Sequence, residues 1–128
     1  MENELHIEYE DKRVKELFDD LNDIYYSQKL LHKHIGKEMA RTVKKRYNQI
    51  IAFNNFWALL SSHIGKIEHM KGEKSDEYSM RITANFRLII KPKVDDYSVE
   101  KLKECDTTII KGVMDYHGKG AKNNWIIP

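Results

Sequence analysis

The chain has 128 residues, of which 41% are hydrophobic, and a formal net charge of +2 at neutral pH. This length allows one domain with a hydrophobic core but not two ordinary domains, and no apolar run approaches the roughly 18 residues that a membrane span requires. The single cysteine excludes an intrachain disulfide, and the acidic start lacks the features of a signal peptide, so we expect one domain over residues 1–128 in the reducing cytoplasm.

The first half of the chain predicts one strand followed by helices. Residues 5–9 alternate apolar and polar side chains, which is typical of a half-buried strand. From Lys12 onward, apolar residues recur at a spacing of three and four and predict a helix whose apolar stripe reaches Leu31. Gly36 separates this helix from a second one, which ends at residues 54–55 and is followed by one or two further turns.

Charge is unevenly distributed over this half. Residues 1–24 carry nine acids and three bases, residues 25–74 carry three acids and ten bases, and residues 75–128 carry eight acids and nine bases, for net charges of −6, +7 and +1. A polyanion would be attracted to the basic middle segment, because phosphate binding requires locally clustered Lys and Arg. A solvated helix face explains the same residues.

The second half predicts a β-hairpin with a defined register. Its two alternating apolar sets are Tyr78, Met80, Ile82 and Phe86, Leu88, Ile90. They share one face only if Ile82 lies opposite Phe86, because a slip of one residue would turn one set over. This register leaves residues 83–85 as the loop and places Arg81 directly opposite Arg87. Like charges that face each other across two strands are destabilising unless an anion or acid lies between them, so this pair is a candidate anion site.

The remaining segments complete an α+β pattern. Residues 93–107 are polar and are expected to form a mobile insert, and residues 108–116 form the last strand. The order of a strand, two to three helices and then several strands predicts a largely antiparallel sheet with helices packed on one face. The tail, residues 118–128, contains the apolar run Trp125-Ile126-Ile127. We expect the segment from Lys122 to Ile127 to dock near the sheet edge left by the hairpin, either on its own domain or on a second copy in a homodimer; a frayed terminus is the alternative.

Asp115, Tyr116 and His117 follow one another at the end of the last strand. Imidazole exchanges a proton near neutral pH, and a nearby carboxylate fixes its tautomer. In an extended chain Asp115 and His117 point to the same side, and Asp115 shares this parity with Lys111. Alone, His117 would more often be an ordinary surface histidine.

Lys71 and Lys74 lie in a Lys-Gly-Glu-Lys turn before the hairpin, which is either a plain turn or a phosphate contact. With the two arginines and the Asp-Tyr-His run, Lys71 completes the set of groups needed to cleave RNA without a metal, by attack of the 2′-hydroxyl on its own phosphate. The histidines show no metal-binding spacing, and we expect neither a metal nor another cofactor.

The blocks IEHMKGEKSDEYSMRITANFRLIIKP and IIKGVMDYHGK resemble the RelE/ParE superfamily of toxins, specifically the HigB branch. The resemblance covers residues 66–118 and rests on several short blocks in the right order and at the right spacing. It implies a RelE-like fold and the toxin of a type II toxin–antitoxin pair. Such a toxin is a small endoribonuclease that enters the ribosomal A site, cuts the messenger and is silenced by a co-encoded helix-turn-helix antitoxin.

The resemblance also implies roles for individual residues. Lys71 and Arg87 would contact phosphate, and Asp115, Tyr116 and His117 would form the catalytic and codon-positioning cluster. We expect further substrate contacts from Arg81, Lys74 and His69. Glu68 stands where some relatives have a histidine. Two other functions fit the same scaffold: a non-enzymatic inhibitor like the gyrase-poisoning branch, and a degenerate toxin that only binds its antitoxin.

Overall fold

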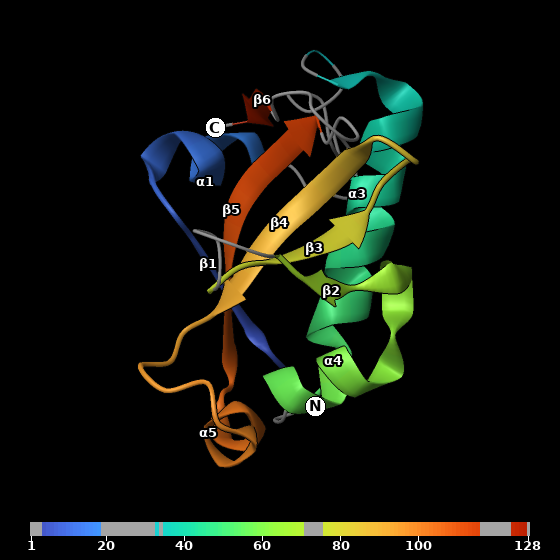
Figure 1. Cartoon of the computed structure of the whole chain (residues 1–128). Helices are drawn as coiled ribbons and strands as arrows, with labels where there is room; N and C mark the ends of the chain where they lie inside the picture. Colours follow the sequence, from blue (N-terminus) through green and yellow to red (C-terminus); the bar gives the residue numbers. More distant parts are fainter. Residues whose placement is uncertain (1–3, 19–32, 34, 71–75, 116–123, 128) are drawn as a thin grey trace.

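The computed structural model describes residues 4–18, 33, 35–70, 76–115 and 124–127. Figure 1 shows helices packed against a twisted sheet. The elements in chain order are β1 (His6–Tyr9), α1 (Lys12–Phe18), α3 (Lys37–Ile51), α4 (Phe56–Ser62), a 3₁₀ turn (Ile64–Lys66), β2 (Glu68–His69), β3 (Tyr78–Arg81), β4 (Phe86–Pro92), α5 (Val99–Glu104), β5 (Thr107–Asp115) and β6 (Asn124–Ile127).

The sheet is largely antiparallel, which confirms the predicted α+β class. Its strand order is β1-β5-β4-β3-β2, and β6 pairs with β5. Strand β1 runs parallel to the start of β5, and β6 runs antiparallel to the end of β5. The first and last strands therefore share one neighbour in the sheet.

The main core lies between the helices and one face of the sheet. Val43, Tyr47 and Ile50 of α3 are buried against the apolar side chains of β3, β4 and β5. Burial of side chains of this size stabilises the fold by roughly 1.5–3 kcal/mol each. The predicted apolar stripe of the second helix is therefore the face that contacts the sheet.

The β3–β4 hairpin has the predicted register. Arg81 pairs with Arg87, and the backbone N–H of Ile82 donates to the carbonyl of Phe86 at 2.9 Å. The hydroxyl of Thr83 accepts a hydrogen bond from the backbone N–H of Phe86 at 3.1 Å and closes the loop.

The start of the first predicted helix is confirmed. The Asp11 carboxylate accepts a hydrogen bond from the backbone N–H of Val14 at 3.0 Å, which lowers the pKa of this carboxyl group below its ordinary value. The described helix α1 ends at Phe18, and the rest of the apolar stripe lies outside the described residues.

The segment 93–107, which we expected to be a mobile insert because of its polarity, contains a helix. Residues Val99–Glu104 form α5, and Ser98 caps it by accepting a hydrogen bond from the backbone N–H of Lys101 at 3.3 Å. Leu102 and Cys105 are 3% and 5% exposed. A cap and two buried side chains are enough to order a short helix against a larger domain.

The described part of the tail docks on its own domain. Strand β6 pairs with β5, and Ile127 is fully buried opposite Val113. Docking on the same chain is therefore confirmed. The expected location at the hairpin edge is wrong, because β6 pairs with the end of β5, on the side where β1 pairs with the start of β5.

No helix in the described ranges is long and apolar enough to cross a membrane.

Candidate functional site

The face of the sheet turned away from α3, called the second face below, carries the predicted arginine pair. Directly opposed residues on neighbouring strands share a face, so Arg81 on β3 and Arg87 on β4 lie side by side there. The Arg87 side chain is 9% exposed, and its Nη2 donates to the carbonyl of Ala84 at 2.9 Å. The guanidinium is thus held against its own hairpin loop.

Glu68 supplies an acid beside this pair. Strand β2 pairs with β3 and sets Glu68 opposite Ser79, and Glu68 Oε1 lies 3.8 Å from Arg87 Nη1. Its side chain is 62% exposed, so the carboxylate remains accessible to solvent. Like charges across the hairpin predicted that an anion or acid would lie between them. The sequence did not identify Glu68 as that acid, because β2 is only two residues long and carries no alternating pattern.

Arg46 of α3 contacts the backbone of the hairpin beside the arginine pair. Its Nε donates to the carbonyl of Arg81 at 2.7 Å, and its Nη1 donates to Gln49 at 2.9 Å. Burial lowers the pKa of the Arg46 guanidinium below its ordinary value. The sequence placed Arg46 among solvated bases on the polar side of the helix, and nothing in the spacing distinguished it from its exposed neighbours Arg41 and Lys45.

His69 lies on the other side of β2. Its ring stacks on that of Tyr78, with centroids 4.6 Å apart and an interplanar angle of 17°. Because successive residues of a strand point to opposite faces, His69 and Glu68 diverge. The structure therefore brings Glu68, but not His69, to the arginine pair.

Asp115 ends β5, where it pairs with Phe86 of β4. The prediction that Asp115 and Lys111 share a side is wrong, because β5 contains a bulge. Ile110 pairs with Ile90 and Gly112 with Ile89, so Lys111 is an extra residue. The φ of Gly112 is 145°, a conformation that favours glycine. The bulge leaves Lys111 on the second face and puts Asp115 in phase with the core residue Val113.

The other predicted site residues are Lys71, Lys74, Tyr116 and His117, and they lie outside the described residues. Their proposed roles remain predictions.

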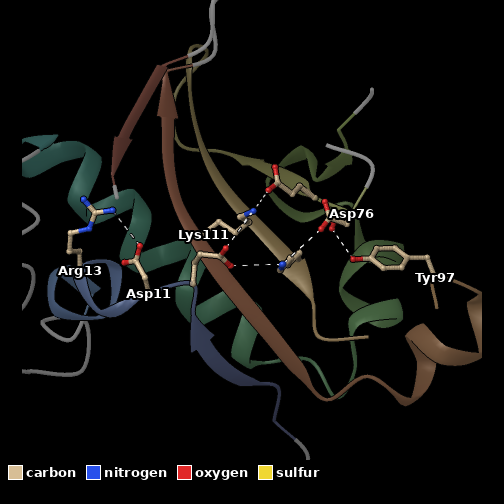
Figure 2. A network of polar contacts seen from close by, with 8 residues as sticks. Asp11, Arg13, Asp76, Tyr97 and Lys111 are labelled. Carbon is tan, nitrogen blue, oxygen red and sulfur yellow. Dashed lines mark hydrogen bonds and ion pairs between the residues drawn. The ribbon is translucent and has the colours of Figure 1, made fainter. Parts of the chain in front are cut away.

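A network of ion pairs occupies the opposite end of the second face (Figure 2). Lys111 pairs with Glu77 and lies 3.9 Å from Glu10. Lys91 lies 3.9 Å from both Glu10 and Asp76. This network sets two lysines against three carboxylates and so does not attract a further anion. At the other end of the face, in the part of the chain that the structure describes, the two arginines lie beside the carboxylate of Glu68.

Two ionisable groups of the network have raised pKa values. Burial opposes the charged form of Lys111, but the hydrogen bond and charge of Glu77, with Glu10 and Asp76 adding, raise the pKa of its ammonium above the ordinary value. The Tyr97 hydroxyl donates to the carbonyl of Asp76 at 3.0 Å. Burial, with the nearby acidic groups adding, raises the pKa of Tyr97 to about 12.

Other candidate sites are weaker. Within the described ranges, no three His, Cys, Asp or Glu side chains gather as they would around a metal ion. A surface depression of about 580 Å³ lies beside α5 and is lined by residues that include Lys91, Tyr97 and Cys105. It contains neither Glu68 nor the arginine pair.

Comparisons with known proteins give structural likenesses only. No protein-family model matches the sequence, and no curated protein matches it significantly. A YoeB/ParE toxin from Agrobacterium tumefaciens is 14% identical, with 89% of this chain and 100% of that chain covered and a TM-score of 0.48. The YoeB–YefM complex from Staphylococcus aureus is 21% identical, with 89% and 98% covered and a TM-score of 0.42. The function is therefore inferred from the residues of this chain.

Proposed function

We propose that the protein is the toxin of a type II toxin–antitoxin pair and that it acts as a ribosome-dependent messenger endoribonuclease. The observation that carries this proposal is the arrangement of Arg81, Arg87 and Glu68 at one end of the second face. Two guanidiniums can bind a phosphodiester, and a carboxylate beside them can accept a proton. The resemblance of residues 66–118 to the HigB branch supports the same activity.

The chemistry needs no metal. Glu68 accepts the proton of the 2′-hydroxyl, and the 2′-oxygen attacks the adjacent phosphorus. The bond from phosphorus to the 5′-oxygen breaks, and that oxygen takes a proton from a general acid. The products are a 2′,3′-cyclic phosphate and a 5′-hydroxyl. Arg87 and Arg81 stabilise the extra negative charge of the transition state, as preorganised donors do.

The remaining roles follow from the sequence. His117 is the general acid, and Tyr116 positions the nucleotide. Asp115 takes no part in this assignment, because it lies in phase with Val113, on the opposite face from the arginine pair. Lys71 adds a third cation to the two arginines at the scissile phosphate, and Lys74 contacts the RNA strand beside it. This assignment gives the carboxylate of Glu68 the base role that a histidine of some relatives would otherwise fill.

Primer extension on a translated message, with and without ribosomes, tests the proposal. We expect cleavage only when ribosomes are present, because the net charge of +2 gives weak attraction to free RNA. Arg87→Ala and Glu68→Gln should each lower the single-turnover rate by on the order of 10²-fold. Arg13→Ala is the matched control, because the Arg13 side chain is 74% exposed on α1, and it should cut like the parent.

The rival functions predict other results. A non-enzymatic inhibitor of gyrase would stop growth without cutting any message. A degenerate toxin would neither stop growth nor cut a message. Equal cutting of free RNA would contradict the ribosome dependence alone. Circular dichroism of each variant must match that of the parent, so that a lost fold is not read as lost chemistry.

We also propose a co-encoded antitoxin with a helix-turn-helix domain. Expression of the adjacent reading frame together with this chain should restore growth and yield a co-purifying complex. Absence of any neutralising neighbour at the locus would contradict this assignment.

A further inference from the structure

A row of cations lies on the outer side of helix α3. Lys37, Arg41 and Lys45 follow one another at intervals of four residues and are exposed, so they share one side of the helix. The buried side of α3, which packs on the sheet, lies opposite. At a rise of about 1.5 Å per residue, these three residues, called the basic row below, extend over about 12 Å. They belong to the basic segment 25–74, and the catalytic assignment above makes no use of them.

The positive charge of the basic row is not neutralised by neighbouring acids. In the part of the chain that the structure describes, none of its three side chains forms an ion pair. Exposed bases elsewhere do: Arg13 lies 3.5 Å from Asp11, and Lys93 lies 3.0 Å from Glu8. Helix α3 itself carries five bases and one acid, Glu38. A helix face that serves only to contact solvent commonly alternates the two signs of charge, whereas this row attracts an anion.

The composition of the basic row fits a nucleic-acid backbone better than a protein surface. Among the described residues, the exposed large apolar side chains are Val99, Trp125 and Ile126, which lie on α5 and β6 and not on α3. The core of a protein interface is enriched in aromatic side chains and depleted of lysine, whereas phosphate binding needs clustered Lys and Arg. Phosphates of one strand recur about every 3.4 Å along a duplex axis, so a row of about 12 Å can contact several of them.

The basic row lies beside the hairpin that carries the arginine pair. A surface depression of about 370 Å³ is lined by residues that include Arg41 of α3 and Thr83 of the hairpin loop, and Figure 1 shows this loop next to α3. The following loop residue, Ala84, holds the guanidinium of Arg87 through its carbonyl. A ligand bound along the basic row therefore also lies next to the loop that positions Arg87.

We propose that the basic row docks the protein on the phosphate backbone of folded ribosomal RNA, while the message binds at the arginine pair on the second face. This inference rests on the proposed function, because it assigns the row to the ribosome on which the message is cut. Three phosphate contacts alone bind weakly at physiological salt, so free RNA is not held. On the ribosome the two contacts act together, and the second becomes effectively intramolecular. The ribosome requirement then follows from two RNA surfaces that must be present at once.

The test compares two variants of the full chain that have the same net charge. The row variant carries Lys37→Gln, Arg41→Gln and Lys45→Gln. The control variant carries Arg13→Gln, Lys101→Gln and Lys103→Gln, which remove three exposed charges from α1 and α5. Circular dichroism and melting temperatures must match those of the parent, so that a changed fold is not read as lost docking.

Co-sedimentation with ribosomes that carry no message measures docking without cleavage. The row variant should bind about tenfold more weakly than the parent, and the control variant should bind like the parent. The slope of log affinity against log salt concentration should become shallower by about three for the row variant, because each lost phosphate contact reduces it by about one. Hydroxyl-radical footprinting identifies the partner: the parent should protect a stretch of ribosomal RNA backbone that the row variant leaves exposed.

Cleavage of a message on ribosomes separates docking from chemistry. The row variant should raise KM for message-loaded ribosomes by about tenfold and keep the kcat of the parent, because its residues do not touch the scissile phosphate. A lower kcat with an unchanged KM would contradict the docking role.

The outcomes distinguish this inference from the proposed function. If the parent neither binds ribosomes nor cuts a ribosome-bound message, both are overturned. If the parent cuts and the row variant equals it in affinity and KM, the docking role is wrong and the proposed function stands. Equal losses in the row and control variants would mean that net charge, and not the basic row, accounts for binding. If the row variant loses only its affinity for the co-purifying antitoxin, the row is a protein contact and the RNA docking role is wrong.

Discussion

Lys111 in the bulge of β5 forms an ion pair with Glu77, the residue before β3. The Glu77 side chain is 2% exposed and that of Lys111 is 17% exposed. This contact depends on the bulge. In a regular strand Lys111 would lie on the same side of the sheet as Asp115, which is the core side, and would point away from Glu77. The pair links β5 to the start of the hairpin on the second face of the sheet.

Lys111→Met should lower the free energy of unfolding by about 3 kcal/mol, because it removes a cation from a buried carboxylate. The double variant Lys111→Met/Glu77→Leu should recover most of this loss, since an apolar pair can replace a buried ion pair. Urea denaturation measures both. Lys101→Met is the control, since its side chain is 52% exposed on α5, and it should change stability by less than about 0.5 kcal/mol. Equal losses in the single and double variants would contradict this account.

The pH dependence of stability should fall in the alkaline range. Tyr97 has a pKa of about 12 in the folded chain and an ordinary value of 10.0. Between these values the unfolded chain releases the phenolic proton first, so rising pH favours unfolding. The raised pKa of Lys111 acts in the same direction above its ordinary value of 10.5. Burial also raises the pKa of Cys105 above its ordinary value of 9.0 and that of Tyr78 above 10.0. We therefore expect thermal melts to show stability that is level near pH 8 and falls as the pH rises from 9.0 to about 12.

Tyr97→Phe isolates the tyrosine contribution. It removes the hydrogen bond to the Asp76 carbonyl, so stability at pH 8 should drop by about 1 kcal/mol. The alkaline decline should become shallower, because Tyr97 no longer titrates there, whereas Lys111, Tyr78 and Cys105, whose pKa values are also raised, still do. An unchanged slope between pH 10 and 12 would show that Tyr97 does not cause the decline.

The hairpin was the part of the fold most accurately predicted from the sequence. Two apolar sets of period two fix a register, since a slip of one residue would expose one set. Arg81 opposite Arg87 followed from that register alone. The bulge in β5 could not be predicted in this way, because Gly112 fits equally well into a regular strand pattern. Its φ of 145° becomes evident only when the partner strand is placed.

Only part of the candidate site could be predicted from the sequence, for a similar reason. Arginines that face each other reveal that an acid is needed, but the acid lies on a strand of two residues whose partner was unknown. From the sequence, Glu68 was therefore noted only as the residue that stands where some relatives have a histidine. Arg46 and the helix α5 were missed because both depend on tertiary contacts, namely a backbone carbonyl of β3 and burial of Leu102.

Gly65→Ala and Gly36→Ala should both destabilise the protein, but for different reasons. Gly65 has φ 63° and ψ 19°, a left-handed conformation that strains alanine, and a methyl group there would also lie 3.0 Å from Arg46 Nε. Gly36 has φ 86° and ψ 162°, a backbone conformation almost restricted to glycine, but none of the neighbouring atoms lies within 4 Å of an added methyl group. We expect a loss of about 1–3 kcal/mol at either position.

The two glycine variants also differ in their effect on the site. Displacement of Arg46 weakens its hydrogen bond to the carbonyl of Arg81, so Gly65→Ala should lower RNA cleavage even at temperatures where the variant is fully folded. Gly36→Ala, at the start of α3, should cut like the parent under the same conditions. Denaturation curves show where each variant is folded, and single-turnover rates measure its cleavage there. If both folded variants lose the same fraction of the cleavage rate, backbone strain and not Arg46 causes the loss.

Deletion of residues 121–128 should lower the melting temperature. Ile127 is fully buried opposite Val113, and loss of a buried side chain of this kind costs about 2–4 kcal/mol. Ile127→Ala should reproduce most of the decrease. Ile126→Ala is the matched control on the same strand, because Ile126 is 37% exposed, and its effect should stay below about 1 kcal/mol.

The deletion should also change how the chain associates. Without β6, the backbone groups of β5 at residues 113–115 lose their partners, and an unpaired strand edge favours pairing with another chain. Light scattering should therefore show a larger mass for the truncated protein than for Ile127→Ala, which keeps the backbone of β6. If both proteins keep the mass and the melting temperature of the parent, β6 contributes neither stability nor protection of the edge, and its assigned place in the sheet is wrong.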